Sequence, residues 1–209
     1  MNKDEIVKEV IVKLDEISEF LNGEDSYSRI KMHFLSEQPV TSDETDHIIW
    51  DLETNGFVAP ENKILEIGCF EVMKSGEIKK HQWVINNNCE ISEEITKING
   101  FTKEICEKEG VVPEKALDEF LAIVKRAKKN ITHNGIRFDI PFLTNYTAHV
   151  LGYDDDRKQA MLKHLRETAF DTAVHYKAKK AGIERNMFET FLEYADRTMN
   201  ILMVGVKYN

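Results

Sequence analysis

The chain has 209 residues, of which 42% are hydrophobic and 31% are charged. This composition can bury the core of one domain with an appendage, and it is too hydrophobic for a chain that is disordered throughout. Lys and Arg number 28 against 37 Asp and Glu, a formal charge of −9, which argues against a protein that holds nucleic acid on a basic surface. It leaves open a site that meets phosphate through bound metal ions, because such ions bring positive charge of their own.

The sequence carries no recognisable membrane span, signal peptide or disulfide pattern. No apolar run approaches the roughly 18 residues that a membrane span needs, and the residues Met1–Glu5 are polar and acidic, unlike a signal peptide. The three cysteines are odd in number and widely spaced, which argues against a disulfide framework or a zinc knuckle. We therefore expect a cytoplasmic protein with reduced thiols and no contact with a membrane.

The first 45 residues are predicted to be an appendage. Apolar residues three or four apart over residues 2–22 predict an amphipathic helix that ends at Asn22-Gly23. Residues 23–46 are polar and rich in turn formers, and we expect a linker there with a short helix around Tyr27–Leu35. The apolar stripe of the first helix is expected to dock on its own domain, with docking on a protein partner as the alternative.

From residue 46 the pattern changes to strands and then to helices. Apolar runs predict strands at 47–53, 64–73 and 78–85, and their short connections favour an antiparallel meander. Helical patterns follow from Ser92 and from Pro113. A strand at 130–133 and four helical segments complete the chain, the helices near 139–151, 155–166, 171–181 and 185–199. This order predicts an α/β fold with a mixed sheet flanked by helices.

The first strand ends in the most informative segment, Trp50-Asp51-Leu52-Glu53-Thr54-Asn55-Gly56. Side chains alternate along a strand, so Asp51 and Glu53 point to the same face. Two neighbouring carboxylates repel each other unless a cation lies between them, and their hard oxygens suit Mg²⁺ or Mn²⁺. The alternative is a solvated strand edge with two ordinary surface acids, because so short a motif also arises by chance.

A further carboxylate follows the strand at 130–133. Asp139 is expected at the start of the next helix, where Pro141 is tolerated in the first turn. A carboxylate there can reach a metal ion held at the neighbouring strand end, or it can serve only as the first-turn acid of its helix. His133, just before it, is expected to be a structural, hydrogen-bonded histidine, because hard cations prefer oxygen ligands.

Four segments together resemble the DEDD 3′→5′ exonucleases, the DnaQ-like group. Residues 50–56 are similar to the first motif of that family, and His133-Asn134-Gly135-Ile136-Arg137-Phe138-Asp139 is similar to the second. Residues 95–104 are similar to the helix and loop that precede the second motif, and Phe170-Asp171-Thr172 is similar to an element that opens a later helix. The order and spacing of the four segments agree over about residues 46–209, and the set is specific although each piece alone is weak.

The resemblance implies a ribonuclease-H-like fold, in which the first three strands of the mixed sheet are antiparallel. It implies that Asp51, Glu53 and Asp139 are the catalytic carboxylates and bind two Mg²⁺ or Mn²⁺ ions, which in such sites lie about 3.5–4 Å apart. Four residues are implied to lie beside the terminal nucleotide of the substrate, namely Thr54, Asn55, Asn99 and Phe138. Phe138 has the alternative of a core aromatic beside the sheet.

The chain departs from the family pattern in its last part. The family carries a fourth carboxylate and a general-base His or Tyr on a late helix, spaced His-x₄-Asp or Tyr-x₃-Asp. The His-x₄-Asp pair of this chain, His149 and Asp154, contains Gly152 and precedes the Phe170-Asp171-Thr172 element, so it does not fit, and no Tyr-x₃-Asp pair occurs. The chain ends in the apolar stretch Asn200–Asn209, and its last residues, Lys207-Tyr208-Asn209, look like the Lys/Arg-x-Asn segment that in the family begins the next helix. We therefore expect a C-terminal truncation that is nearly inactive, with a natural short form as the alternative.

Two functions from different classes follow. The first is a metal-dependent exonuclease domain that releases nucleoside monophosphates from the 3′ ends of single-stranded DNA or RNA. Proofreading-type domains are the most similar members, with RNase T-like and oligoribonuclease-like enzymes as alternatives. The second is a catalytically inactive domain of the same fold that binds nucleic acid or a protein partner. The expected boundaries are 1–45 for the helical extension and linker and 46–209 for the exonuclease domain without its C-terminal helices.

Overall fold

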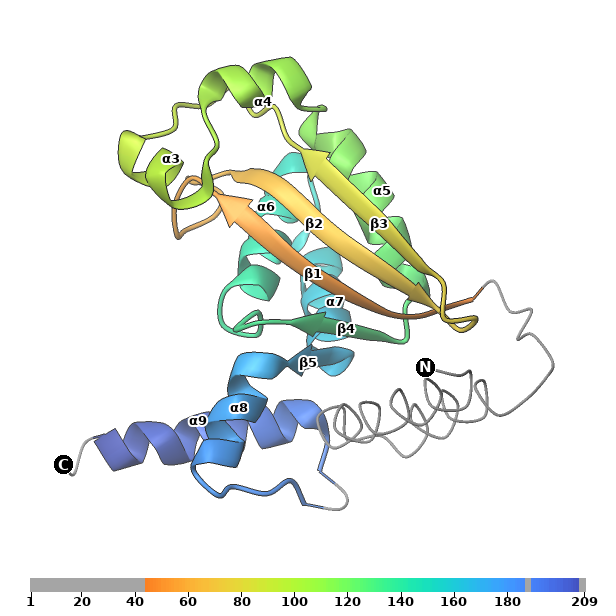
Figure 1. The fold of residues 1–209 in the computed structure, drawn as a ribbon, viewed down its shortest axis with the longest axis vertical. Helices are drawn as coiled ribbons and strands as arrows, with labels where there is room; N and C mark the ends of the chain where they lie inside the picture. The colour runs from red at the N-terminus through yellow and green to blue at the C-terminus, as the bar shows by residue number, and fades with distance from the viewer. Residues whose placement is uncertain (1–43, 187–188, 207–209) are drawn as a thin grey trace, which may run out of the picture. The chain divides into compact units, whose positions relative to one another are not determined.

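The computed structural model describes residues 44–186 and 189–206 (Figure 1). The predicted N-terminal helix, most of the linker and the expected docking of that helix lie outside the described residues. All three cysteines are free thiols, as predicted. Within the described part of the chain, no helix combines the length and the apolar character that crossing a membrane requires.

Five strands form one mixed sheet in the order β3-β2-β1-β4-β5 (Figure 1). The first three, β1 (Thr45–Thr54), β2 (Ile64–Met73) and β3 (Ile78–Val84), are antiparallel, as the resemblance implies. β4 (Lys129–Thr132) is parallel to β1, and β5 (Ala169–Asp171) is parallel to β4. The observed fold is therefore the predicted α/β, ribonuclease-H-like sheet.

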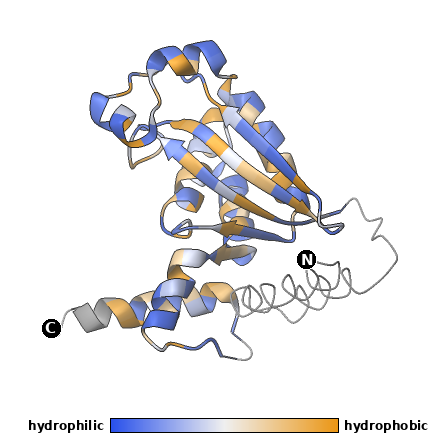
Figure 2. Ribbon diagram, viewed as in Figure 1, coloured by the Kyte–Doolittle hydropathy of each residue, from blue (hydrophilic) through white to orange (hydrophobic). Residues whose placement is uncertain are grey.

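One face of the sheet is covered by helices, which lie behind the strands in Figure 1. α5 (Pro113–Arg126) and α6 (Asp139–Val150) pack on it, and α7 (Asp155–Glu167) packs beside α6. Hydrophobic and hydrophilic residues alternate along the strands, as Figure 2 shows, so each strand offers one apolar side to the core. Trp50 of β1 lies against Phe120 of α5 with ring centroids 5.4 Å apart.

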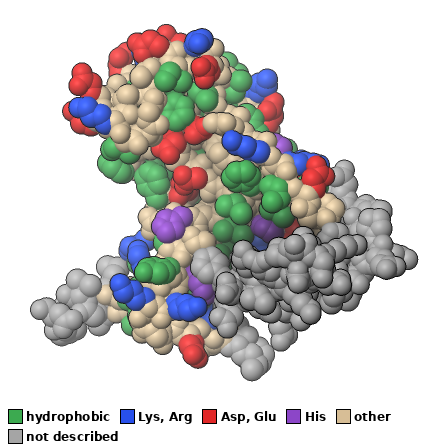
Figure 3. Space-filling model, viewed as in Figure 1, with side chains coloured by type: hydrophobic (Ala, Val, Ile, Leu, Met, Phe, Trp, Pro, Cys, Tyr) green, Lys and Arg blue, Asp and Glu red, His purple; other side chains and the backbone are tan. Residues whose placement is uncertain are grey.

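The other face, turned toward the viewer in Figure 1, is more open. The register pairs Ile49 with Ile131 and Ile131 with Phe170, so these side chains share this face. Ile49 is 44% exposed and Phe70 is 46% exposed, and Figure 3 shows hydrophobic side chains on this side of the sheet. Asp51 and Glu53 alternate with the buried residues of β1 and therefore belong to the open face as well.

An ion pair with a buried carboxylate fastens α5 to the sheet. Glu71 of β2 accepts hydrogen bonds from Arg126 Nε at 2.7 Å and from Arg126 Nη2 at 2.8 Å. His81 Nε2 lies 3.0 Å from the same carboxylate, and the hydroxyl of Thr45 also donates to it. The Arg126 guanidinium is the main reason that the pKa of Glu71 falls to about 2. This charged cluster fixes the far ends of β1 and β2, well separated along the strands from Glu53.

Two short segments differ from the sequence prediction. α3 (Glu93–Asn99) begins after Ser92 as expected, but a second short helix, α4 (Lys103–Glu109), was not predicted. The strand β5 was also missed, because a buried run of three residues has no readable period. α8 (Thr172–Lys180) lies where a helix was expected.

The predicted start of the last helix is wrong. α9 (Phe191–Val206) begins six residues later than the predicted Arg185 and continues beyond Met199. The cause is a reciprocal capping box: the Thr190 hydroxyl accepts from Glu193 N at 3.2 Å, and the Glu193 carboxylate accepts from Thr190 N at 2.8 Å. The cap fixes the first turn at Thr190, so the preceding polar residues stay outside the helix.

Candidate active site

The site begins with the two carboxylates of β1. Asp51 is exposed and Glu53 is half-buried, whereas Trp50 and Leu52 are buried on the opposite face, as the alternation predicts. Partial loss of water around its carboxylate nevertheless raises the pKa of Asp51. Burial also raises the pKa of Glu53, the charge of Asp51 raises it further, and a hydrogen bond from the Asn99 side chain acts in the opposite direction. The two carboxylates are therefore close enough to repel each other.

Asp139 joins this pair from the first turn of α6. Its side chain is 3% exposed, and burial is the main reason that its pKa rises to about 7. The negative charge of Asp51 is the next largest cause, while backbone hydrogen bonds, including one from the amide of Leu52, favour the ionised form. Asp51 thus interacts with both of the other predicted carboxylates, and the structure brings the three together at the end of β1.

The donor chemistry of these three residues fits a divalent cation. Carboxylate oxygens are the ligands that Mg²⁺ and Mn²⁺ prefer, and a cation would relieve the repulsion that raises the pKa of Glu53 and Asp139. Among residues 44–186 and 189–206, no three or more His, Cys, Asp or Glu side chains already form a group able to hold a metal ion.

The position of Asp139 depends on a carboxylate that the sequence reasoning identified only as part of a motif. Asp171, at the end of β5, is fully buried. It accepts hydrogen bonds from Asn134 N at 2.9 Å and from Ile136 N at 3.1 Å, which hold the loop that leads to Asp139. It also accepts from the first amides of α8, Ala173 N at 3.0 Å and Val174 N at 3.2 Å. Because its oxygens accept hydrogen bonds from backbone amides, Asp171 anchors the loop that leads to Asp139.

Glycine is required in that same loop for lack of space. A Cβ atom on Gly135 would lie 2.2 Å from Thr132 Oγ1. The preceding residue, Asn134, has a φ of 64°, a left-handed conformation that asparagine tolerates better than most residues. The Asn-Gly pair therefore lets the chain fold back tightly against β4 before Asp139.

The turn after β1 is held by the side chains of two predicted substrate-binding residues. Thr54 Oγ1 donates to the carbonyl of Gly56 at 2.7 Å. Asn55 Oδ1 accepts from Lys63 N at 2.6 Å, and Asn55 Nδ2 donates to the carbonyl of Glu90 at 3.1 Å. These bonds give both side chains a structural task, and their place beside a terminal nucleotide stays a prediction.

Asn99 ties α3 to the carboxylates. Its Nδ2 donates to the carbonyl of Thr54 at 3.2 Å, and its side chain also interacts with Glu53. Its Oδ1 accepts from Phe101 N at 3.1 Å, which fixes the orientation of the amide. The structure therefore places Asn99 next to the candidate carboxylates, and its place beside a terminal nucleotide stays a prediction.

Phe138 forms part of an aromatic cluster at the edge of the core. Its ring centroid lies 5.6 Å from that of Phe142 and 6.3 Å from that of Phe57. Phe138 is partly buried, in keeping with the alternative of a core aromatic, whereas Phe57 is 80% exposed. The sequence reasoning missed Phe57. Its signal is its place directly after Gly56, in the turn that follows the two carboxylates.

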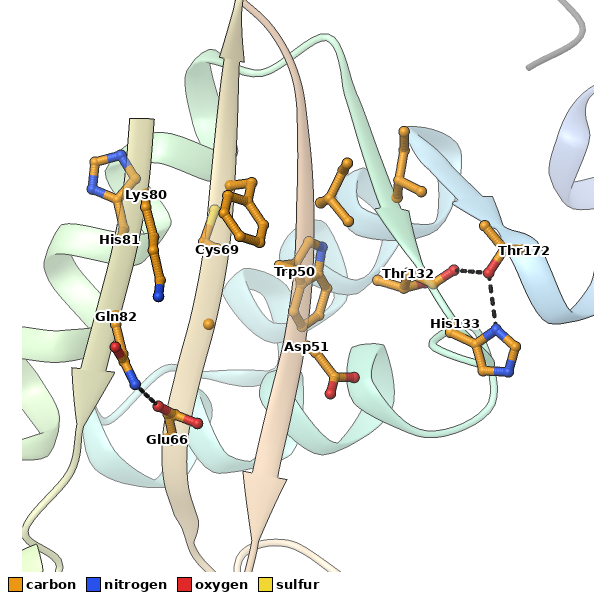
Figure 4. A pocket seen from close by; sticks show the side chains of 14 residues that line it. Trp50, Asp51, Glu66, Cys69, Lys80, His81, Gln82, Thr132, His133 and Thr172 are labelled. Atoms are coloured by element: carbon orange, nitrogen blue, oxygen red, sulfur yellow. Dashed lines mark hydrogen bonds between the residues drawn. The ribbon is translucent and has the colours of Figure 1, made fainter. Parts of the chain in front are cut away.

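A groove of about 540 Å³ opens beside Asp51 on the open face of the sheet (Figure 4). Strands β1 to β4 line it, and Glu66 and Lys80 stand on the side of β2 and β3. His133 lies on the opposite side, where its Nδ1 is 3.0 Å from Thr172 Oγ1. The prediction of a hydrogen-bonded histidine at this position is confirmed.

The raised pKa of Asp139 predicts how the metal-free protein responds to pH. The folded protein holds the Asp139 proton up to about pH 7, whereas the unfolded chain releases it near the ordinary value of 3.8. The folded state therefore binds more protons in this window, and the free energy of unfolding falls as the pH rises from about 4 to about 8. In EDTA, the free energy of unfolding of Asp139→Asn should fall by roughly 2–4 kcal/mol less than that of the wild type over this pH range, because asparagine does not titrate.

Urea denaturation at several pH values, with EDTA and with Mn²⁺, measures this effect. Mn²⁺ should stabilise the wild-type protein more than the Asp139→Asn variant. The exposed Asp118 of α5 provides the control, since Asp118→Asn should follow the wild-type curve. Parallel pH curves for the wild type and Asp139→Asn in EDTA would show that Asp139 is an ordinary acid.

Comparison with known proteins identifies the family of this chain. A family model described as an exonuclease, RNase_T, matches residues 48–198. The DNA polymerase III PolC-type protein of Thermotoga maritima is 29% identical over 123 residues, which are 59% of this chain and 9% of that protein. The corresponding protein of Mycoplasma genitalium is 28% identical over 96 residues, 46% of this chain and 6% of that protein. The chain thus spans less than a tenth of the length of these relatives.

Solved structures share the fold. Escherichia coli exonuclease I in complex with a dA16 oligonucleotide superposes with a TM-score of 0.55 at 14% identity, covering 66% of this chain and 30% of that one. The zinc-bound form of the E. coli exonuclease I–single-stranded DNA complex gives a TM-score of 0.56 at 12% identity, covering 79% of this chain and 41% of that one. Because the family model covers most of the chain and spans both carboxylate-bearing segments, the chain belongs to the exonuclease family, within the DEDD superfamily that its sequence resembles.

Proposed function

We propose that this chain is a metal-dependent 3′→5′ exonuclease domain that acts on single-stranded DNA or RNA ends, with a low rate because the fourth carboxylate and the general base of the family pattern have no counterpart in its sequence. The observation that carries the proposal is the meeting of Asp51, Glu53 and Asp139 at one edge of the open face. Their pKa values are raised by burial, and the charge of Asp51 adds to the shift at Glu53 and Asp139. Without a cation, the repulsion between these carboxylates lowers the stability of the folded protein. A cluster of carboxylates with raised pKa values is therefore a strong candidate for a functional site.

The three carboxylates would divide the work of holding Mg²⁺ or Mn²⁺. Asp51 interacts with both partners, so it is the residue best placed to contact two ions. Bound ions of this kind activate water and neutralise charge on a phosphodiester. Asn99 orients Glu53, and the loop anchored by Asp171 holds Asp139 against β1. Hydrolysis of the last phosphodiester would release a nucleoside 5′-monophosphate.

Single-stranded ends fit the surface of the protein better than long duplexes. Acidic side chains gather over α3 and α4 in Figure 3, and the net charge of −9 gives little attraction for a long polyanion. The exposed ring of Phe57 beside Phe138 offers a surface on which any base can stack. The similarity to PolC-type polymerases and to exonuclease I bound to oligonucleotides supports DNA as the first substrate to test.

The second candidate function is a catalytically inactive domain that binds nucleic acid. It is favoured by the lack, among the described residues, of a ready-made group of three metal-ligating side chains. The two functions predict different results with the same reagents. An exonuclease shortens its oligonucleotide when Mn²⁺ is added, whereas an inactive domain binds the oligonucleotide and leaves its length unchanged.

The direction of digestion tests the proposed activity. With Mn²⁺, a single-stranded oligonucleotide labelled at its 5′ end should shorten stepwise, because nucleotides leave from the 3′ end. The same strand labelled at its 3′ end should release a labelled mononucleotide first. Parallel DNA and RNA strands decide the sugar preference. Loss of the 5′ label as a mononucleotide, or digestion that persists in EDTA, would contradict the proposal.

A further inference from the structure

The helix α8 carries an exposed basic face in an otherwise acidic protein. Residues 172–183 contain three lysines and no Asp or Glu, whereas the whole chain has a formal charge of −9. Lys177, Lys179 and Lys180 are exposed, and none of them forms an ion pair with a carboxylate of the described residues. Tyr176, which precedes them, is 62% exposed. Cations beside an exposed aromatic ring are the side chains that bind the phosphates and bases of single strands.

The lysines of the helices on the acidic side of the site are arranged differently. On α3, Lys97 lies 3.9 Å from the carboxylate of Glu93. On α4, Lys103 lies 2.5 Å from the carboxylate of Glu90. Figure 3 shows acidic side chains over α3 and α4 and Lys and Arg side chains over α8, which lies below β4 and β5 in the view of Figure 1. A polyanion that leaves the site is therefore repelled over α3 and α4 and attracted along α8.

The exposed face of α8 begins at the groove that contains Asp51. Thr172, the first residue of α8, lines that groove (Figure 4). Residues four apart share a face of a helix, so Tyr176 and Lys180 continue the face of Thr172 away from the groove. Lys179, three residues after Tyr176, borders the same face. At 1.5 Å per residue, Lys180 lies about 12 Å beyond Thr172, roughly the rise of three to four stacked nucleotides.

We propose that the α8 face, formed by Tyr176, Lys179 and Lys180, binds the single-stranded substrate about three to four nucleotides upstream of its 3′ end. This inference rests on the proposed exonuclease function, because it takes the 3′ end to lie at the three candidate carboxylates. The lysine ammonium groups contact phosphates, and the tyrosine ring stacks on one base. Such contacts give affinity without sequence preference. The face is small, in keeping with the negative net charge.

The salt dependence of binding tests the two lysines. The probe is a 5′-fluorescein oligothymidylate of about twelve nucleotides with a phosphorothioate at its last linkage, and anisotropy gives Kd at a fixed, low Mn²⁺ concentration. Lys179→Gln/Lys180→Gln should weaken binding roughly tenfold at low salt. It should also lower the slope of log Kd against log salt concentration by about 1.4, because each lost phosphate contact of a single strand accounts for about 0.7.

The matched control removes two exposed lysines from the helix-covered side of the sheet. Lys115→Gln/Lys125→Gln on α5 changes the net charge by the same amount. It should leave both Kd and the slope close to the wild-type values, because α5 lies on the other face of the sheet. Circular dichroism and thermal unfolding verify that every variant is folded.

The length of the strand separates the α8 face from the carboxylates. A dinucleotide held at the carboxylates ends before Tyr176, so the double variant Lys179→Gln/Lys180→Gln should bind it as tightly as the wild type does, measured by competition with the probe. Tyr176→Ala should weaken binding of the long strand by roughly fivefold or more, and Tyr176→Phe, which keeps the ring, should restore it.

The outcomes separate this inference from the function on which it rests. A double lysine variant with wild-type slope and affinity overturns the role of the α8 face, as does an equal loss of affinity for the dinucleotide and the long strand. If the expected losses occur but the wild type leaves unmodified DNA at full length with Mn²⁺, the α8 face is supported and only the hydrolysis is refuted. A wild type that binds neither strand overturns both.

Discussion

Replacement of Asp51 by asparagine is expected to reduce hydrolysis of single-stranded oligonucleotides by roughly 10³-fold or more. Asp51 is the carboxylate that interacts with both Glu53 and Asp139, so its loss removes the charge at the centre of the cluster. Asparagine has the same shape, and the residue is exposed, so the fold should be unaffected. The initial rate of mononucleotide release and the circular dichroism spectrum of the variant measure the two effects.

A second carboxylate in the same groove provides the matched control. Glu66 of β2 accepts a hydrogen bond from Gln82, and its charge is the smallest of the four influences on the pKa of Glu53. Glu66→Gln should therefore change the rate by only a few-fold. An Asp51→Asn protein that digests the oligonucleotide as fast as the wild type would refute the assignment of the site.

The largest effect on stability is expected from Asp171→Ala. The substitution leaves four buried amides without their acceptor, two in the loop at Asn134 and Ile136 and two at the start of α8. Each buried donor left without a partner costs about 1–3 kcal/mol, and relaxation allows some amides to find water. We therefore expect the free energy of unfolding to fall by roughly 3–5 kcal/mol, measured by urea denaturation.

Asp171→Asn separates the charge from the hydrogen bonds. Its Oδ1 can still accept from Asn134, Ala173 and Val174, but its amide group would face the N–H of Ile136. This variant should be intermediate in stability and should lose activity, because the loop that positions Asp139 is loosened. An Asp171→Ala protein within about 1 kcal/mol of the wild type would show that the anchor is unimportant.

The elements predicted best were those whose pattern repeats within the element itself. β2 lies at Ile64–Met73 as predicted, and α5 begins at Pro113 with its apolar residues on one side. β5 and α4 were missed because each is too short to show a period. The start of α9 was wrong although its signal, Thr190 three residues before Glu193, is a local one.

The residues of the candidate site also fall into those that a local pattern identifies and those that it does not. The shared face of Asp51 and Glu53 follows from the period of a strand alone, and the structure brings Asp139 to them. The role of Asp171 and the contact between His133 and Thr172 depend on how β4 pairs with β5. Such pairing joins residues about forty positions apart, and nothing in the local pattern specifies it. Sequence reasoning could therefore find the carboxylates but not the groups that hold them in place.

The candidate site changes the interpretation of the negative net charge. A formal charge of −9 argues against a basic surface for nucleic acid, and the acidic residues over α3 and α4 agree with this. Three of the carboxylates, however, lie together at the end of β1 and raise the energy of the cation-free protein. The charge is thus compatible with a polyanionic substrate provided that divalent ions accompany it.

The central claim is that Asp51, Glu53 and Asp139 hold divalent ions where the substrate is cut. Anomalous diffraction from crystals of the protein with Mn²⁺ and a phosphorothioate oligonucleotide tests it most directly, because the signal locates the metal without reference to activity. We expect an anomalous peak between the carboxylates of Asp51 and Glu53 and within reach of Asp139. A peak elsewhere, with no manganese at these three side chains, would contradict the account.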